Sequence, residues 1–190
     1  MARYPMRSSW RNYKPGAAAP AVLSVARIAS GGARILGLDP GSLRTGYGVI
    51  DFSGGNLAIV AQGCIATSGG RLADRLRLIH ARVTELIAEH RPQEVAVERV
   101  FLAKNADSAL KLGQARGAAL AAVPATLEVH EYAPRAIKLA VVGVGGAEKG
   151  QVAHMVKQLL RVDLKLAADA ADALAIAICH AHSRRFELSA

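Results

Sequence analysis

Residues 35–51, ILGLDPGSLRTGYGVID, contain two short apolar runs separated by a glycine-rich polar loop. The first run ends in Asp39, and the second, YGVID, occupies 47–51. A Ser-Gly-Gly sequence at 53–55 then precedes a third apolar run within 58–66. Because short glycine-rich turns connect antiparallel strands, we expect the chain to open with a three-stranded antiparallel meander.

A layered α/β pattern follows the meander. Apolar residues recur at helical spacing over 71–90, and Pro92 closes the predicted helix. The next run, EVAVE at 94–98, follows a helix and should therefore lie parallel to the first strand through a right-handed crossover. The remaining predicted elements are a helix over 105–123, a strand over 127–132, and helices over 134–142, 148–160 and 167–182. This order predicts an α/β fold in which helices flank both faces of a five-stranded mixed sheet.

Length and charge indicate one domain with a basic extension. The chain has 190 residues, and 52% of them are hydrophobic, which argues against a disordered protein. Residues 1–34 hold six of the 24 Lys and Arg residues and no acid, so the net charge of +9 divides into +6 for this segment and +3 for the rest. We expect a disordered extension over 1–33, whose composition also resembles a transit peptide, a domain over 34–183 and a short tail over 184–190.

Hydropathy and cysteine content exclude two further classes. No stretch reaches the roughly 18 uncharged apolar residues that a membrane-spanning helix needs. Cys64 and Cys179 lack the spacing of a zinc site or a disulfide framework, and we expect both to be small core residues. These features favour a cytoplasmic protein. The mildly basic domain would suit a polyanionic partner, although many soluble domains carry such a charge.

Four acids occur where a fold of this kind binds ligands. Asp39 and Glu98 end two apolar strands and, if those strands are parallel neighbours, share one edge of the sheet. Asp169 and Asp172 are three residues apart in the apolar segment ADAADALAIAICHAH, so they share one helix face. Solvated strand ends and a favourable helix dipole explain each pair separately. They do not explain a set of four, since adjacent carboxylates on an apolar helix need a compensating cation.

The donor chemistry of these acids indicates which cation. Four carboxylates without a His or Cys ligand set are hard oxygen donors, which select Mg²⁺ or Mn²⁺ over zinc. Two such ions, about 3.5 to 4 Å apart, activate a water and stabilise the leaving oxygen in phosphodiester hydrolysis. The loop after Asp39 also looks like the phosphate loop of the actin and sugar-kinase ATPases. Those folds need a second phosphate loop and an adenosine-binding segment, and neither is visible in the sequence.

Several segments together resemble RuvC, the family of bacterial Holliday-junction resolvases with a ribonuclease H-like fold. The matching segments are ILGLDPGSLRTGYGVID, VAVERVFLAKNADSALKLGQARG, GVGGAEK and ADAADALAIAICHAH. The similarity covers residues 34–182. By position, it implies that Asp39, Glu98, Asp169 and Asp172 are the catalytic acids and hold two Mg²⁺ ions per active site, for which Mn²⁺ can substitute.

The resemblance also implies a substrate and partners. Members of this family are homodimers that cut two opposed strands of a four-way DNA junction, near thymines, in recombination and repair. They work with the RuvA and RuvB branch-migration proteins. The resemblance assigns DNA contacts to Phe101, which would stack on an unpaired base, and to Lys138 and Lys149, which would hold the backbone. From the residues alone, a core position is the better explanation of Phe101.

Two other functions are compatible with parts of the sequence. A YqgF-type nuclease acting on RNA would share the fold and fewer motifs, and a non-catalytic junction-binding module would lack at least one of the four acids, all of which are present. We expect all six histidines to be structural or surface residues, since His180 and His182 lie far along the helix from the acids. Small residues within 114–122 predict a close helix–helix contact, either internal or at a dimer interface.

Overall fold

The centre of the fold is a five-stranded sheet with the strand order β3-β2-β1-β4-β5. The computed structural model describes residues 32–67, 69–99 and 105–187. The strands are β1 (Ala33–Asp39), β2 (Arg44–Ser53), β3 (Asn56–Ala66), β4 (Glu94–Glu98) and β5 (Glu128–Tyr132). β1, β2 and β3 form an antiparallel meander, whereas β4 pairs in parallel with both β1 and β5. The predicted mixed sheet is therefore confirmed.

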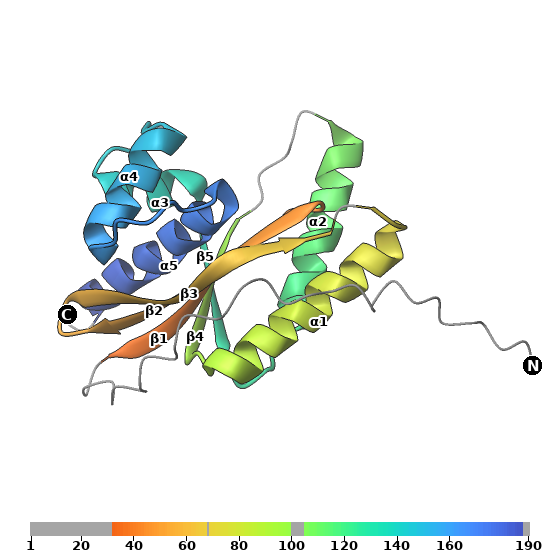
Figure 1. Cartoon of the computed structure of the whole chain (residues 1–190), viewed down its shortest axis with the longest axis horizontal. Coiled ribbons are helices and arrows are strands. Elements are labelled where there is room, and N and C mark those ends of the chain that lie inside the picture. The colour runs from red at the N-terminus through yellow and green to blue at the C-terminus, as the bar shows by residue number, and fades with distance from the viewer. Residues whose placement is uncertain (1–31, 68, 100–104, 188–190) are drawn as a thin grey trace, which may run out of the picture.

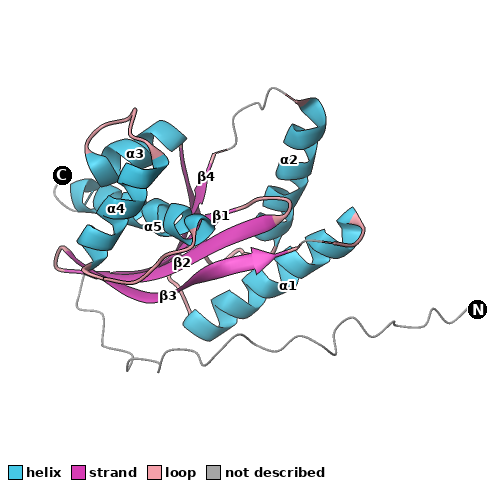
Figure 2. Cartoon of the chain, turned by 45° about the horizontal axis from the view of Figure 1, so that its top comes forward, coloured by secondary structure: helices cyan, strands magenta, loops and turns pink. Residues whose placement is uncertain are grey.

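Helices cover both faces of this sheet (Figures 1 and 2). They are α1 (Leu72–His90), α2 (Ala106–Ala121), α3 (Pro134–Val142), α4 (Lys149–Leu160) and α5 (Ala168–Glu187). α1 and α2 pack on one face, and α3, α4 and α5 on the other. Across the described ranges, no helix is long and apolar enough to cross a membrane.

The alternation of side chains along β1 explains how one strand serves two cores. Leu36 and Leu38 are fully buried and contact the cluster under α1 and α2. Ile35, also fully buried, belongs to the cluster under α5. Because successive side chains of a strand point to opposite faces, the almost continuous apolar run of β1 is the pattern of a central strand covered on both sides.

Glycines let α5 lie directly on β1 and β2. A Cβ added at Gly37 would stand 2.2 Å from the carbonyl oxygen of Ala173, and one added at Gly46 would stand 2.0 Å from the carbonyl oxygen of Asp169. Both distances are far below van der Waals contact, so these positions exclude any side chain. The close approach brings the amino-terminal turn of α5 to the edge of the sheet at which β1 ends.

Three expectations need correction or refinement. α5 continues to Glu187 instead of ending near 182, so the expected tail overlaps the helix, and Arg184 is held there by an ion pair of 3.2 Å with Glu94. The small-residue contact of α2 is internal for Ala115 and Ala119, which are fully buried in the cluster shared with α1. Residues 1–31 of the predicted extension over 1–33 lie outside the described residues, and Ala33 already belongs to β1.

Candidate active site

Asp39 and Glu98 lie side by side at one edge of the sheet. β1 and β4 pair in parallel with Leu38 opposite Val97, so the next residue of each strand is an acid. Both acids are partly buried. The prediction that these two strand-end carboxylates share one edge is confirmed.

The first turn of α5 adds two acids to the same edge. Asp39 pairs with Gly46 across the β1–β2 ladder, and the main chain of Asp169 rests on that glycine. Asp172 follows one turn further along the helix. Burial, followed by the charge of Asp172, raises the pKa of Asp39 to about 6; Lys149 opposes the shift, and Asp169 adds to it. The negative charges of both acids of α5 therefore act on Asp39.

Glu98 experiences the same concentration of negative charge. Burial raises the pKa of Glu98 to about 7, and the charges of Asp39 and Asp172 add to the effect, whereas Lys149 and Lys138 act against it. Carboxyl groups perturbed in this way by burial and by neighbouring acids are characteristic of functional sites. A cation at this edge would relieve the repulsion and favour the charged carboxylates.

Two basic side chains already neutralise the acids of α5. The Nε atom of Arg44 lies 2.5 Å from Oδ2 of Asp169, and Nζ of Lys149 lies 2.9 Å from Oδ2 of Asp172. Although burial acts in the opposite direction, the hydrogen bond and charge of Arg44 hold the pKa of Asp169 below its ordinary value. The acids of α5 are thus paired with cations of the chain, while Asp39 and Glu98 have no such hydrogen-bonded cation among the described residues.

Two of the three residues expected to contact DNA lie near this edge, and their contact with DNA stays a prediction. Lys149 begins α4 and pairs with Asp172. Lys138, on α3, is close enough for its charge to act on Glu98. Phe101 lies outside the described residues, in the segment 100–104 that follows Glu98.

Two residues at the site could not be identified from the sequence alone. Arg44 occurs in the loop quoted at the outset but looks like any exposed arginine. Arg116, on α2, donates from Nε to the carbonyl oxygen of Glu98 at 3.3 Å and forms an ion pair with Glu131 at 2.8 Å. The partners of both arginines are remote in sequence, so only the fold identifies them.

Cys64 was expected in the core and is instead half-buried beside the acids. On β3, it is the register partner of Gly46, the β2 glycine that the main chain of Asp169 approaches. Burial and the charge of Asp169 raise the pKa of its thiol, although Arg44 acts against them. Cys179 is buried as expected, and burial raises its pKa to about 12.

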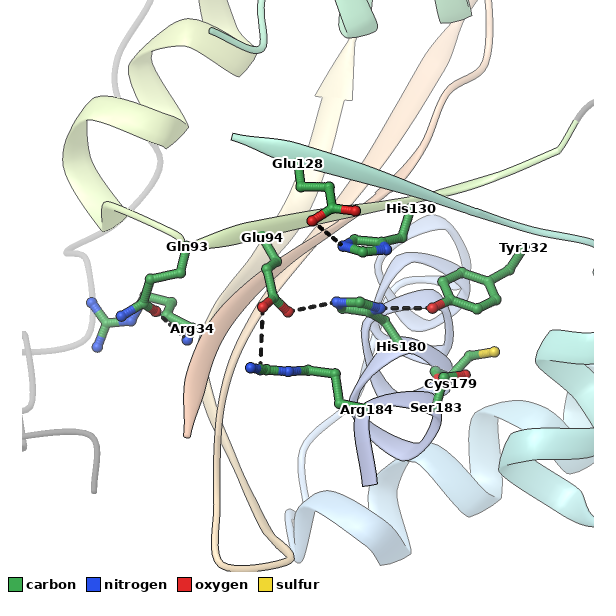
Figure 3. Close-up of polar contacts among 10 residues, drawn as sticks. All are labelled: Arg34, Gln93, Glu94, Glu128, His130, Tyr132, Cys179, His180, Ser183 and Arg184. Carbon is green, nitrogen blue, oxygen red and sulfur yellow. Dashed lines mark hydrogen bonds and ion pairs between the residues drawn. The ribbon is translucent and has the colours of Figure 1, made fainter. Parts of the chain in front are cut away.

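A second group of titratable side chains lies at the opposite end of β4 (Figure 3). Among the described residues, one group of three potential metal ligands has its ligand atoms within 4.8 Å of one another. The group consists of Glu94, His130 and His180. Four residue-to-residue steps along the strand, on the order of 13 Å, separate Glu94 from Glu98. This group is therefore distinct from the four acids.

Its contacts describe a hydrogen-bonded network better than an ion site. Nε2 of His180 lies 2.6 Å from Oε2 of Glu94, and Nδ1 lies 2.7 Å from the hydroxyl of Tyr132 (Figure 3). Arg184 pairs with the other carboxylate oxygen of Glu94, and the ring of His130 stacks on His180 at 4.1 Å with an interplanar angle of 27°. Two stacked rings cannot both direct a nitrogen lone pair at one ion. The network ties α5 to β4 and β5, in agreement with the expected structural role of His180.

Comparison with known sequences gives a consistent result over most of the chain. The family model described as crossover junction endodeoxyribonuclease RuvC matches residues 35–180. Proteins of that name from Vibrio campbellii and Tolumonas auensis are 59% and 55% identical to this chain over 152 residues. The alignments cover 80% of this chain and 88% of each relative.

Comparison with solved structures agrees. The Thermus thermophilus RuvC structure is similar with a TM-score of 0.74 and 36% identity, over 81% of this chain and 96% of that one. T. thermophilus RuvC in complex with a Holliday junction substrate gives a TM-score of 0.75 at 36% identity, over 82% and 96%. The yeast mitochondrial Holliday junction resolvase, at 13% identity over 80% of this chain and 81% of that one, has a TM-score of 0.58 and shares the fold.

Proposed function

Since this chain belongs to the RuvC family of crossover junction endodeoxyribonucleases, we propose that it resolves Holliday junctions by metal-dependent hydrolysis at the edge formed by Asp39, Glu98, Asp169 and Asp172. The observation that carries this assignment is the convergence of four acids from β1, β4 and α5, with two of their carboxyl groups raised to pKa values of about 6 and about 7. A stable fold would not by itself concentrate unpaired carboxylates in this way.

The donor set fits Mg²⁺ held by these four acids. All four side chains offer carboxylate oxygens, which Mg²⁺ and Mn²⁺ prefer, and four ionised carboxylates carry the charge that two divalent ions would balance. Bound there, the ions would supply water activation and charge stabilisation at the leaving oxygen.

The protein's own side chains supply position and charge. Asp39 and Glu98 stand on paired strands, and Asp169 and Asp172 stand on a helix whose main chain contacts β1 and β2, so the four carboxylates would approach the DNA as one rigid set. Lys138 and Lys149 would hold the DNA backbone beside them, in line with the salt-dependent affinity of such contacts. Phe101 would stack on an unpaired base.

A homodimer accounts for two cuts in opposed strands, since each subunit has one set of acids. The outward face of α2 supports this proposal. Leu110 is 67% exposed, and Gly113 and Gly117 share its face with open space above them. Leu110→Glu should shift the protein to monomer in light scattering, whereas Leu139→Glu, at a position 57% exposed on α3, should not. RuvA and RuvB are the partners that family membership favours.

A substrate panel tests the proposal. The full chain with Mg²⁺ should cut a four-way junction with paired, ligatable nicks and leave duplex DNA and structured RNA intact. Asp39→Asn should abolish cutting and leave junction binding largely unchanged, because the acids hold metal and repel phosphate. Preferential cutting of RNA would indicate a YqgF-type activity, and binding without cutting would indicate a non-catalytic module.

A further inference from the structure

Arg44 lies at the site, but it is not among the residues to which the sequence motifs assign a role. It is the first residue of β2, and its Nε atom lies 2.5 Å from Oδ2 of Asp169. Lys149 stands in the same relation to Asp172, at 2.9 Å, from the start of α4. Two cations of the chain thus pair with the carboxylates of α5 from two different elements.

The same carboxylate of Asp169 is needed for a divalent ion. An arginine and an ion that compete for one carboxylate weaken each other's binding by the same factor, which is a requirement of thermodynamic linkage. The Arg44 side chain is 56% exposed, and exposed ion pairs contribute little stability. Arg44 can therefore leave Asp169 without disturbing the fold.

Once released, Arg44 would present a free guanidinium beside the acids. A guanidinium matches a phosphate with two parallel hydrogen bonds, and it remains charged at any pH the protein experiences. Its position at the start of β2, five residues after Asp39, places it next to the edge at which the scissile backbone would lie. No other described side chain on β2 or β3 forms an ion pair with these four acids.

We propose that Arg44 is a phosphate-binding residue of this nuclease, which Asp169 holds until a divalent ion takes that carboxylate, and which then contacts the backbone of the bound DNA. The inference rests on the proposed metal site and junction substrate. It predicts two effects of opposite sign: removal of Arg44 strengthens metal binding and weakens DNA binding.

The test uses the full chain and three variants. Arg44→Gln removes the charge, Arg44→Lys keeps the charge without the planar fork, and Arg77→Gln is the matched control. Arg77 is 73% exposed and pairs with Asp74 at 3.0 Å on α1, away from the acids. Mn²⁺ affinity is measured by titration calorimetry without DNA, and junction affinity by anisotropy in Ca²⁺ at several salt concentrations.

For Arg44→Gln we expect Mn²⁺ to bind about two- to fivefold more tightly, in keeping with the strength of an exposed ion pair. Junction binding should weaken, and the slope of log affinity against log salt should fall by about 1. Arg44→Lys should retain the salt slope and part of the affinity, and Arg77→Gln should match the wild type. Misfolding cannot produce this result, since it would weaken both interactions.

Failure of the inference differs from failure of the proposed function. If the wild type binds Mn²⁺ and the junction but Arg44→Gln behaves as Arg77→Gln in either assay, the exchange role of Arg44 is wrong and the nuclease assignment stands. If the wild type binds neither Mn²⁺ nor the junction, the proposed function fails and the inference fails with it.

Discussion

Arg116 fixes the main chain of Glu98, because its Nε atom donates to the Glu98 carbonyl oxygen at 3.3 Å while its guanidinium pairs with Glu131 at 2.8 Å. The link joins α2 and β5 to the end of β4. Only 18% of the Arg116 side chain is exposed, so a single arrangement is enforced. A change at Arg116 should therefore displace, through the main chain, Glu98, one of the four acids proposed to be catalytic.

Arg116→Gln should lower junction cleavage and Mn²⁺ affinity by about 10- to 100-fold, the usual effect of losing a residue that orients a metal ligand. The melting temperature should fall much less than for a core truncation. Arg99→Gln is the control, since Arg99 lies 3.8 Å from the same Glu131 and is 59% exposed. Wild-type Mn²⁺ affinity in Arg116→Gln would show that the link is purely structural.

The raised pKa values of Asp39 and Glu98 predict how metal-free stability depends on pH. The pKa of Asp39 rises from 3.8 to about 6 and that of Glu98 from 4.5 to about 7, so the folded state disfavours both charged forms. The cost is complete above pH 7 and disappears as pH falls through 7 and 6 toward the unfolded values.

Asp39→Asn should therefore stabilise the metal-free protein at pH 7.5, on the order of 1 to 3 kcal/mol, and this gain should shrink toward pH 4.5. Thermal unfolding of both proteins in EDTA measures it. Added Mg²⁺ should raise the melting temperature of the wild type and leave that of Asp39→Asn nearly unchanged. A variant less stable than the wild type at pH 7.5 would contradict the electrostatic explanation.

Sequence patterns predicted most of this architecture because its strongest determinants are local. Apolar runs, turn glycines and helical periodicity located the elements, and the parallel crossover placed Asp39 beside Glu98. The contacts of Arg44 and Arg116 were not predictable, since each joins residues at least 15 positions apart whose pairing depends on side-chain direction. His180 was correctly taken as structural, but its partners Glu94 and Tyr132 come from separate strands and give no pattern of their own.

Phe101 is three residues after Glu98 in the sequence, and its DNA contact remains a prediction. Phe101→Ala should reduce single-turnover junction cleavage by the equivalent of about 1 to 3 kcal/mol of lost stacking, while Phe101→Tyr or Phe101→Trp should preserve much of the activity. A core phenylalanine would instead cost roughly 3 to 5 kcal/mol of stability on truncation. A strongly destabilised Ala variant whose folded fraction cuts normally would identify a packing residue.

The His180 network predicts an acid-side loss of stability. Burial lowers the pKa of His180 even though Glu94 favours protonation, and His130 and Arg184 add to the lowering. Because the folded state disfavours the charged imidazole, the stabilisation is present above about pH 6.5 and is lost as pH falls below that value toward the depressed folded pKa.

Tyr132→Phe removes one hydrogen bond of this network and should cost about 1 kcal/mol at pH 7.5. His180→Gln should lower stability at pH 7.5 and should lose the difference from the wild type as pH falls below 6.5. His80→Gln, at an exposed position on α1, serves as the control and should change neither. Denaturant unfolding at pH 7.5 and 5.5 provides the comparison, and a constant difference for His180→Gln at both values would contradict the assignment.

The glycines under α5 also limit how this domain can be altered by design. Gly37 and Gly46 meet the main chain of Ala173 and Asp169 so closely that even one added methyl group must lift the helix. Lifting it would move the two carboxylates that α5 delivers, so a mutant library at these two positions should return glycine alone among active clones. Gly150 on α4, with open space around its Cβ position, should accept alanine and gain about 0.5 to 1 kcal/mol. The spacing of the acids is therefore encoded as much by missing side chains on two strands as by the carboxylates themselves.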